Sequence, residues 1–206
     1  MQLDHVLIAV ADLAAATARF EAEHGLASVE GGRHPGWGTA NRIVPLGDAY
    51  LELIAVVDED EAAASEFGRW VARGAAGAGR LLGWAVRPED LDAVVRRLDL
   101  VAHRGARAGA DGSLVRWRSA GLEAAAAEPS LPFFLEWAPG TSFPGRSAAP
   151  QPASIARLAL RGDPERLSSW LGPHTLPVTI DPGPPAITGL VLAGPRGCTV
   201  IGRREA

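Results

Sequence analysis

The stretch that decides the fold is GGRHPGWGTANRIVPLGDAYLELIAV, residues 31–56. A glycine-rich segment that contains His34 leads here into an apolar run, residues 50–56, with Glu52 in its middle. Residues two apart in a strand share a face, so Glu52 is expected to point the same way as Tyr50. A carboxylate on a covered face costs on the order of several kcal/mol unless a partner compensates its charge. A metal ion, an arginine or a proton could be that partner.

Composition excludes several function classes. The chain has 206 residues, enough for one domain or two small ones, and a net charge of −4 without a basic run. Nucleic-acid binding, which needs a positive surface, is therefore not expected. All 20 basic residues are arginine, which excludes lysine-based Schiff-base and P-loop chemistry. Cys198 is the only cysteine, so no intrachain disulfide and no cysteine-based metal site can form.

No sign of a membrane or export segment is found. No apolar run approaches the roughly 20 residues of a membrane span. The first residues, MQLDH, lack the basic and apolar regions of a signal peptide. A cytoplasmic protein without membrane partners is expected.

The first third of the chain predicts one strand-helix-strand-strand-strand unit. Residues 3–10 form an apolar strand pattern, Asp12 is a helix N-cap candidate, and Gly25 is placed to end the helix. Three strands are expected to follow, and a short helix after them. These strands span residues 27–30, 39–45 and 50–57.

The same pattern then returns, after a glycine-rich connector at residues 74–80. LLGWAVRPEDL, residues 81–91, aligns without a gap on LDHVLIAVADL, residues 3–13. FFLEW echoes AYLEL, which aligns Glu136 with Glu52. Such an internal repeat indicates a tandem architecture. Residues 138–153 are rich in Pro, Ser and Gly and predict a linker. Residues 154–206 predict a partial third β-α-β unit packed on the sheet, with strands at 155–160, 187–193 and 198–202 and a helix at 163–171.

With these motifs the sequence resembles the vicinal-oxygen-chelate superfamily, the fold of glyoxalase I, extradiol dioxygenases and bleomycin-resistance proteins. Within it, the chain looks like the glyoxalase-like branch. The match rests on LDHVLIAV with His5, the loop GGRHPGWGTANRIVPLG and YLELI with Glu52. It covers about residues 1–140 and implies an α+β fold. Two βαβββ modules, about residues 1–73 and 81–140, would form one cupped mixed sheet.

The resemblance also implies a metal site. In the superfamily, each module supplies one ligand from its first strand and one from its last strand to a divalent ion. Carried over, the ligands are His5, Glu52 and Glu136, and the fourth position falls on Gly83, which has no side chain. A histidine and two carboxylates suit Mn²⁺, Fe²⁺, Ni²⁺ or Zn²⁺ without selecting among them.

Two functions follow from the resemblance. The first is a divalent-metal-dependent isomerase, lyase, epimerase or dioxygenase acting on a small oxygen-rich substrate in the cup, with Glu52 or Glu136 as the catalytic base. The second is a metal-free protein that sequesters a small molecule, like the bleomycin-resistance branch. His5 and the two glutamates favour the first, whereas Gly83 favours the second. The family also dimerises, so a homodimer is a further expectation.

Several side chains are candidate substrate contacts, and each has an ordinary structural alternative. His5 could be a half-buried histidine bonded to backbone, and the glutamates could pair with arginines. The loop could be a glycine-rich turn anchored by one aromatic ring, and strand tryptophans are more often core than pocket. The candidate substrate contacts are His34, Trp37, Asn41, Trp84, Arg116 and Trp117.

Overall fold

The computed structural model describes residues 1–75, 80–109, 112–147, 151–195 and 197–202. Most of the expected connector at residues 74–80, and residues 148–150 of the expected linker, lie outside the described part.

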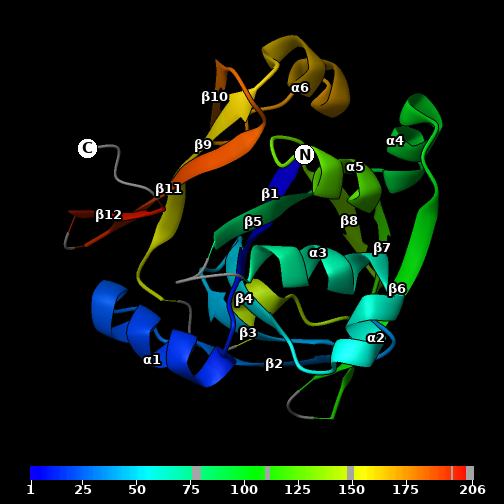
Figure 1. Ribbon diagram of the computed structural model, residues 1–206. Helices are drawn as coiled ribbons and strands as arrows, with labels where there is room; N and C mark the ends of the chain where they lie inside the picture. Colours follow the sequence, from blue (N-terminus) through cyan, green and yellow to red (C-terminus); the bar gives the residue numbers. More distant parts are fainter. Residues whose placement is uncertain (76–79, 110–111, 148–150, 196, 203–206) are drawn as a thin grey trace.

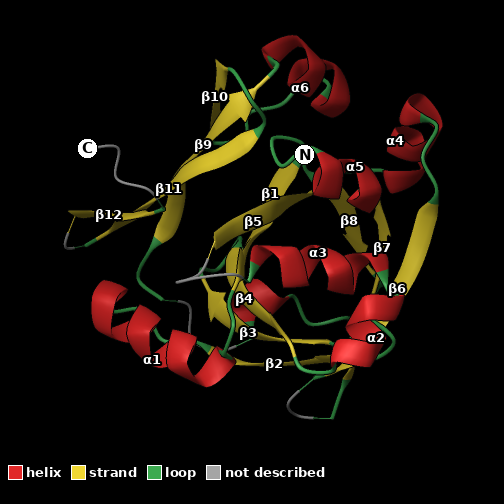
Figure 2. Ribbon diagram, in the orientation of Figure 1, coloured by secondary structure: helices red, strands yellow, loops and turns green. Residues whose placement is uncertain are grey.

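A curled eight-stranded sheet, sheet A, forms the body of the molecule (Figures 1 and 2). The strands lie in the order β2-β3-β4-β1-β5-β8-β7-β6, so each module contributes four neighbouring strands. Within each module the first and last strands pair in parallel, and β1 pairs with β5 antiparallel to join the modules. This confirms the predicted cupped mixed sheet. Its strands are β1 (Gln2–Ala9), β2 (Val29–His34), β3 (Thr39–Pro45), β4 (Tyr50–Val56), β5 (Arg80–Arg87), β6 (Ala102–Ala108), β7 (Leu114–Ala120) and β8 (Phe133–Trp137).

Matching caps begin the first helix of each module. The Asp12 side chain accepts from the backbone N–H of Ala15, and Asp90 accepts from that of Ala93. Gly25 ends the first helix with a left-handed backbone, φ 67°. The helices are α1 (Leu13–His24), α2 (Glu59–Ala64), α3 (Glu66–Gly74), α4 (Leu91–Leu98), α5 (Leu122–Ala127), the 3-10 helix η1 (Pro144–Arg146) and α6 (Pro164–Leu171).

Different helices cover the two sides of sheet A. On the inner side, α3 lies across the curl, and Trp70 packs in an apolar cluster with Leu7 and Phe133. On the outer side, α1 and α4 pack on a second cluster that includes Val6 and Trp84. Alternate residues of β1, β4 and β8 therefore enter different clusters, as expected for strands buried on both faces.

The tail forms a second sheet, sheet B, which shares the outer cluster. The Trp170 ring lies 5.8 Å from that of Phe134, and Trp170 Nε1 donates to the carbonyl of Pro132 at 2.8 Å. The sequence predicted strands around residues 155–160, 187–193 and 198–202, but not β10, which lies in a proline-rich segment. The strands of sheet B, in order, are β10 (Val178–Pro182), β9 (Ser154–Gly162), β11 (Ala186–Gly194) and β12 (Gly197–Ile201).

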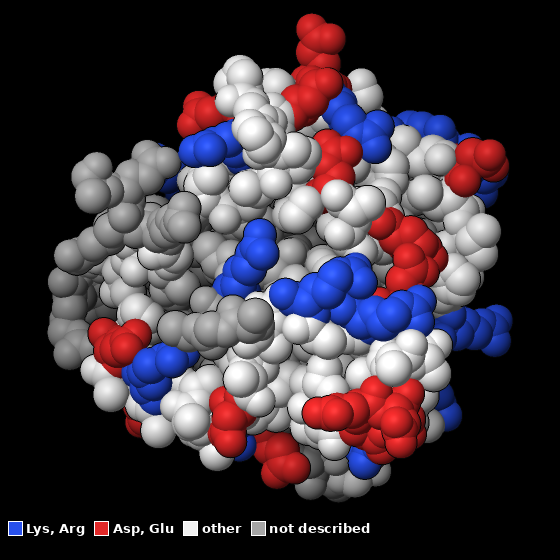
Figure 3. Space-filling view, in the orientation of Figure 1, with Lys and Arg blue, Asp and Glu red and all other residues white. Residues whose placement is uncertain are grey.

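Other differences from the prediction are local. The helices α2 and α5 were not predicted, because both are short and alanine-rich without a clear periodicity. β2 extends to His34 and pairs with β3, so the glycine-rich segment expected to be a loop forms the end of a β-hairpin. Acidic and basic side chains are interspersed on the face shown in Figure 3. Within the described ranges, no helix has the length and apolar character needed to cross a bilayer.

Candidate functional site

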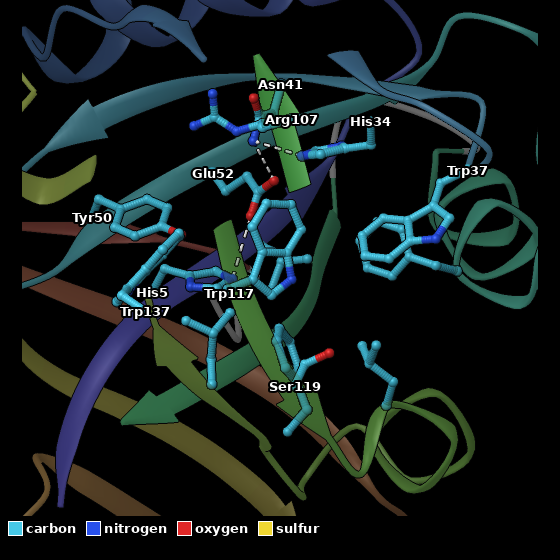
Figure 4. A pocket seen from close by; sticks show the side chains of 15 residues that line it. His5, His34, Trp37, Asn41, Tyr50, Glu52, Arg107, Trp117, Ser119 and Trp137 are labelled. Atoms are coloured by element: carbon cyan, nitrogen blue, oxygen red, sulfur yellow. Dashed lines mark hydrogen bonds and ion pairs between the residues drawn. The ribbon is translucent and has the colours of Figure 1, made fainter. Parts of the chain in front are cut away.

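A pocket opens on the inner side of sheet A, with about 460 Å³ of space when its open mouth is included (Figure 4). Both modules line it. His5 and Leu7 come from β1, Tyr50 and Glu52 from β4, and the alternate residues Phe133, Leu135 and Trp137 from β8.

His5 is held between two buried carboxylates. Its Nδ1 lies 2.6 Å from Asp4 Oδ1, and its Nε2 lies 3.3 Å from Glu52 Oε2. All three side chains are buried. Adjacent strand residues normally face opposite ways, but the β1–β5 ladder shifts register between Leu3 and His5. This β-bulge allows Asp4 to turn toward its neighbour.

Asp4 has two further partners that compensate its charge. Trp137 Nε1 donates to Asp4 Oδ2 at 2.9 Å, and Arg87 Nε lies 3.2 Å from the same oxygen. Such partners are needed, because a buried carboxylate is stable only when it is paired and hydrogen-bonded. The sequence prediction missed Asp4, because strict alternation assigns it to the face opposite His5.

Asn41 and His34 complete the polar side of the pocket. Asn41 Nδ2 donates to Glu52 Oε1 at 2.6 Å and lies 3.5 Å from His34 Nε2. His34 Nδ1 lies 3.0 Å from Thr39 Oγ1. These contacts fix the orientation of the Glu52 carboxylate, with one oxygen toward Asn41 and the other toward His5.

Burial keeps His34 neutral. Desolvation, together with the nearby positive charge of Arg107, lowers the pKa of His34 to about 4, although the charge of Glu52 opposes the shift. Burial also raises the pKa of Tyr50, and the charges of Asp4 and Glu52 add to that effect. The phenol therefore stays protonated at neutral pH.

The low pKa of His34 predicts a loss of stability in mild acid. The unfolded chain binds a proton near pH 6.5, whereas the folded chain does so only near pH 4, so stability falls as the pH drops through this window. Two and a half pKa units correspond to about 3 kcal/mol of unfolding free energy. Urea unfolding between pH 7.5 and 4.5 measures it. His34→Gln should make the free energy of unfolding depend less on pH, whereas His103→Gln, at an exposed position, should leave that dependence unchanged. An equal dependence on pH in the native protein and both variants would contradict the prediction.

Aromatic rings form the opposite side of the pocket. Trp37 lies 4.8 Å from Phe67 and 5.9 Å from Trp117, between ring centroids. Trp117 in turn lies 6.0 Å from Trp137, and Tyr50 stacks on the His5 ring at 4.6 Å. A flat apolar ligand could pack against these surfaces.

The structure brings six of the nine predicted site residues to this pocket. Glu136, Trp84 and Arg116 are not among its lining residues. Trp84 is fully buried in the outer cluster, and Arg116 is exposed because Trp117 and Ser119 are the residues of β7 that face inward. The six residues at the pocket are His5, His34, Trp37, Asn41, Glu52 and Trp117.

Glu136 lies on the other face of β8, where its carboxylate accepts from Arg118 Nη1 at 3.1 Å. The strand register explains its position. Leu7 pairs with Glu52 in the first module, and Ala85, which aligns with Leu7, pairs with Phe133 in the second. Phe133 therefore occupies the position equivalent to Glu52, and the sequence alignment of FFLEW on AYLEL was wrong for the sheet.

The donor set does not fit the three-ligand metal site that the resemblance implies. Glu136 is absent from the pocket, which leaves only His5 and Glu52 of the three expected ligands there. A Cβ on Gly83 would lie 2.5 Å and 2.6 Å from two ring carbons of Trp70, so that ring fills the fourth ligand position. Among the described residues, no group of three or more His, Cys, Asp or Glu side chains could hold a metal ion.

The pocket is also lined by residues that the sequence did not predict, namely Arg107, Ser119 and the inward residues of β8. Ser119 could have been identified from the alternation of residues 115, 117 and 119 on β7. The inward residues of β8 could have been identified from the alternation of residues 133, 135 and 137. No local pattern identifies Arg107, because its strand β6 is mostly exposed and meets the pocket only through the curl of the sheet.

Comparison with known proteins supports the fold. A hypothetical protein from Staphylococcus aureus has a similar structure, with a TM-score of 0.71 at 13% identity over 94% of this chain and 91% of that one. The methylmalonyl-CoA epimerase of Mycobacterium tuberculosis is 24% identical over 66% of this chain and 85% of its own, with a TM-score of 0.46. No curated protein matches in sequence. The model of the glyoxalase-like domain matches residues 3–175, and the chain therefore belongs to the glyoxalase-like domain family.

Proposed function

We propose that this protein is a metal-independent enzyme that removes a proton from a small oxygen-bearing compound, with Glu52 as the general base. The observation that carries the proposal is the buried chain Asp4–His5–Glu52, which ends at the pocket. Ionisable groups are costly to bury, and in a cleft they are more often retained for chemistry than elsewhere.

The chain can hold and orient a proton. With the Nδ1–H of His5 donated to Asp4, Nε2 faces Glu52 Oε2, and their contact at 3.3 Å requires one proton between them. Asn41 donates to the other oxygen of Glu52 and so holds the carboxylate in a fixed orientation. Glu52 retains free lone pairs, with which it can accept a proton from a compound in the pocket.

The metal-dependent isomerase, lyase, epimerase or dioxygenase chemistry expected from the resemblance is not part of this proposal. Such chemistry needs a chelating set of ligands, and only His5 and Glu52 of the expected three face the pocket.

Hydrogen–deuterium exchange tests the proposed base. The native protein is incubated in D₂O with pyruvate, phenylpyruvate, acetoacetate and dihydroxyacetone, and loss of C–H signal is followed by proton NMR. Glu52→Gln should slow the exchange about 10²- to 10⁴-fold, the usual contribution of a general base. The matched control is Glu136→Gln, which makes the same change outside the pocket and should leave the rate unchanged.

Two outcomes would contradict the proposal. One is exchange that survives unchanged in Glu52→Gln. The other is exchange that disappears after dialysis against a chelator and returns with a divalent ion, which would restore the metal-dependent alternative.

Metal-free sequestration of an aromatic compound is a second candidate, favoured by the adjoining rings of Trp37, Phe67 and Trp117. Under this alternative, an aromatic ligand quenches tryptophan fluorescence. No C–H exchange occurs in either the native protein or Glu52→Gln.

A further inference from the structure

Arg107 places a positive charge at the wall of the pocket. Arg107 is 6% exposed, and its Nη1 donates to the backbone carbonyls of Gly31 and Ala108. Figure 4 shows it beside Asn41 and Glu52. No carboxylate in the described part of the chain lies within ion-pair distance, 4.0 Å, of this guanidinium.

The carboxylates nearest to the pocket have other partners. Glu52 contacts Asn41 and His5, and Asp4 contacts His5, Arg87 and Trp137. A buried guanidinium with only neutral carbonyl partners is costly, because its charge is desolvated without a counter-charge. The guanidinium carries five N–H donors, and both of its bonds to these carbonyls come from Nη1.

A purely structural role explains only part of this arrangement. Through Gly31, Arg107 joins the edge strands β2 and β6 and so closes the curl of sheet A. Two backbone carbonyls could be bound by a neutral donor at a lower desolvation cost. The positive charge is therefore the feature that a structural role leaves unexplained.

We infer that Arg107 anchors a carboxylate group of the ligand, so that the compound bound in this pocket is a small monocarboxylic acid. The inference rests on the proposed function and adds its substrate class. A guanidinium presents N–H groups in a fork that matches the two oxygens of a carboxylate. A monoanion suits the site better than a dianionic phosphate, because Glu52 adds a negative charge and Arg107 is the only arginine among the described residues lining the pocket.

The position of Arg107 also orients the ligand. With the carboxylate held at Arg107, the adjoining carbon lies on the Glu52 side of the pocket, and the remainder reaches the Trp37 and Trp117 rings. Proton removal there breaks one C–H bond, transfers the proton to Glu52 and leaves the electron pair on the ligand. Return of a deuteron from the solvent completes the exchange.

Pairs of acids and their amides test the inference on the native protein. Binding of propionate, phenylacetate and indole-3-acetate is measured by calorimetry and compared with that of propionamide, phenylacetamide and indole-3-acetamide. At least one acid should bind about 10- to 100-fold more tightly than its amide, the contribution expected of charge-assisted hydrogen bonds. Equal binding within every pair, or no binding of any acid at millimolar concentration, overturns the inference.

Variants then assign the preference to one side chain. Arg107→Met should abolish the difference in affinity between each acid and its amide, and Arg107→Lys should retain part of that difference. The matched control is Arg104→Met, an exposed arginine on the same strand, which should retain all of it. A preference that survives in Arg107→Met also overturns the inference.

The two proposals can fail separately. Acid preference that depends on Arg107, without exchange that depends on Glu52, leaves a carboxylate-binding protein and removes the base. Exchange that depends on Glu52, with equal binding of acids and amides, retains the base and removes the carboxylate anchor.

Discussion

A chain that ends at Ala153 is expected not to fold, because sheet B supplies part of the cluster that covers the outer side of sheet A. Phe134 is fully buried and its ring lies against Trp170 of α6. The truncation also removes a set of leucines buried in the same cluster, each of which contributes about 1.5–3 kcal/mol by burial. Their sum, about 9–18 kcal/mol, is as large as the roughly 5–15 kcal/mol of net stability of a typical domain. These leucines are Leu158, Leu160, Leu167, Leu171, Leu190 and Leu192.

Solubility on expression and circular dichroism measure this result. The control ends at Gly194 and removes β12, in which Ile201 is the buried side chain among the described residues. That shorter deletion should fold with a stability lowered by about 2 kcal/mol, the contribution of one buried isoleucine. A soluble 1–153 chain with a cooperative unfolding transition would show that the two modules of sheet A form an independent domain.

Asp4→Asn is expected to lower the free energy of unfolding by about 3 kcal/mol, the lower end of the cost of breaking a buried ion pair. The substitution keeps the size of the side chain but removes the negative charge that compensates Arg87. Arg87 is itself partly exposed, with its guanidinium 4.0 Å from the Phe143 ring centroid. It can therefore regain some hydration, which limits the loss.

Urea unfolding at neutral pH compares this variant with Asp12→Asn. Asp12 is exposed and caps α1, and asparagine is an equally good N-cap, so the control should change stability by only a few tenths of a kcal/mol. A loss below about 1 kcal/mol in Asp4→Asn would mean that the buried carboxylate is replaceable by any polar group.

Elements within each module could be predicted because their signals are local. Asp12 and Gly25 border α1, Asp90 begins α4, and the apolar run around Glu52 forms β4 as expected. The gapless repeat of residues 3–13 at 81–91 correctly indicated two modules. Caps and apolar periodicity depend on neighbours within a few residues, so one sequence is enough to identify them.

Parts of the site could not be predicted because they depend on contacts between distant strands. Glu136 resembles Glu52 in sequence, but the pairing of β5 with β8 places Phe133 in the equivalent position. A bulge turns Asp4 toward His5, against the alternation of the strand. In each case a shift of register changes which face a side chain occupies.

The amino-acid order thus specifies the repeated elements and places His5 and Glu52 in strands of the first module, since propensity and periodicity act over a few residues. The curl of sheet A and the packing of α3 determine which side chains meet in the pocket. The curl brings Arg107 to the pocket wall, and α3 lays Trp70 over Gly83. These contacts join segments far apart in the chain, and their geometry follows from strand register and close packing of the whole core.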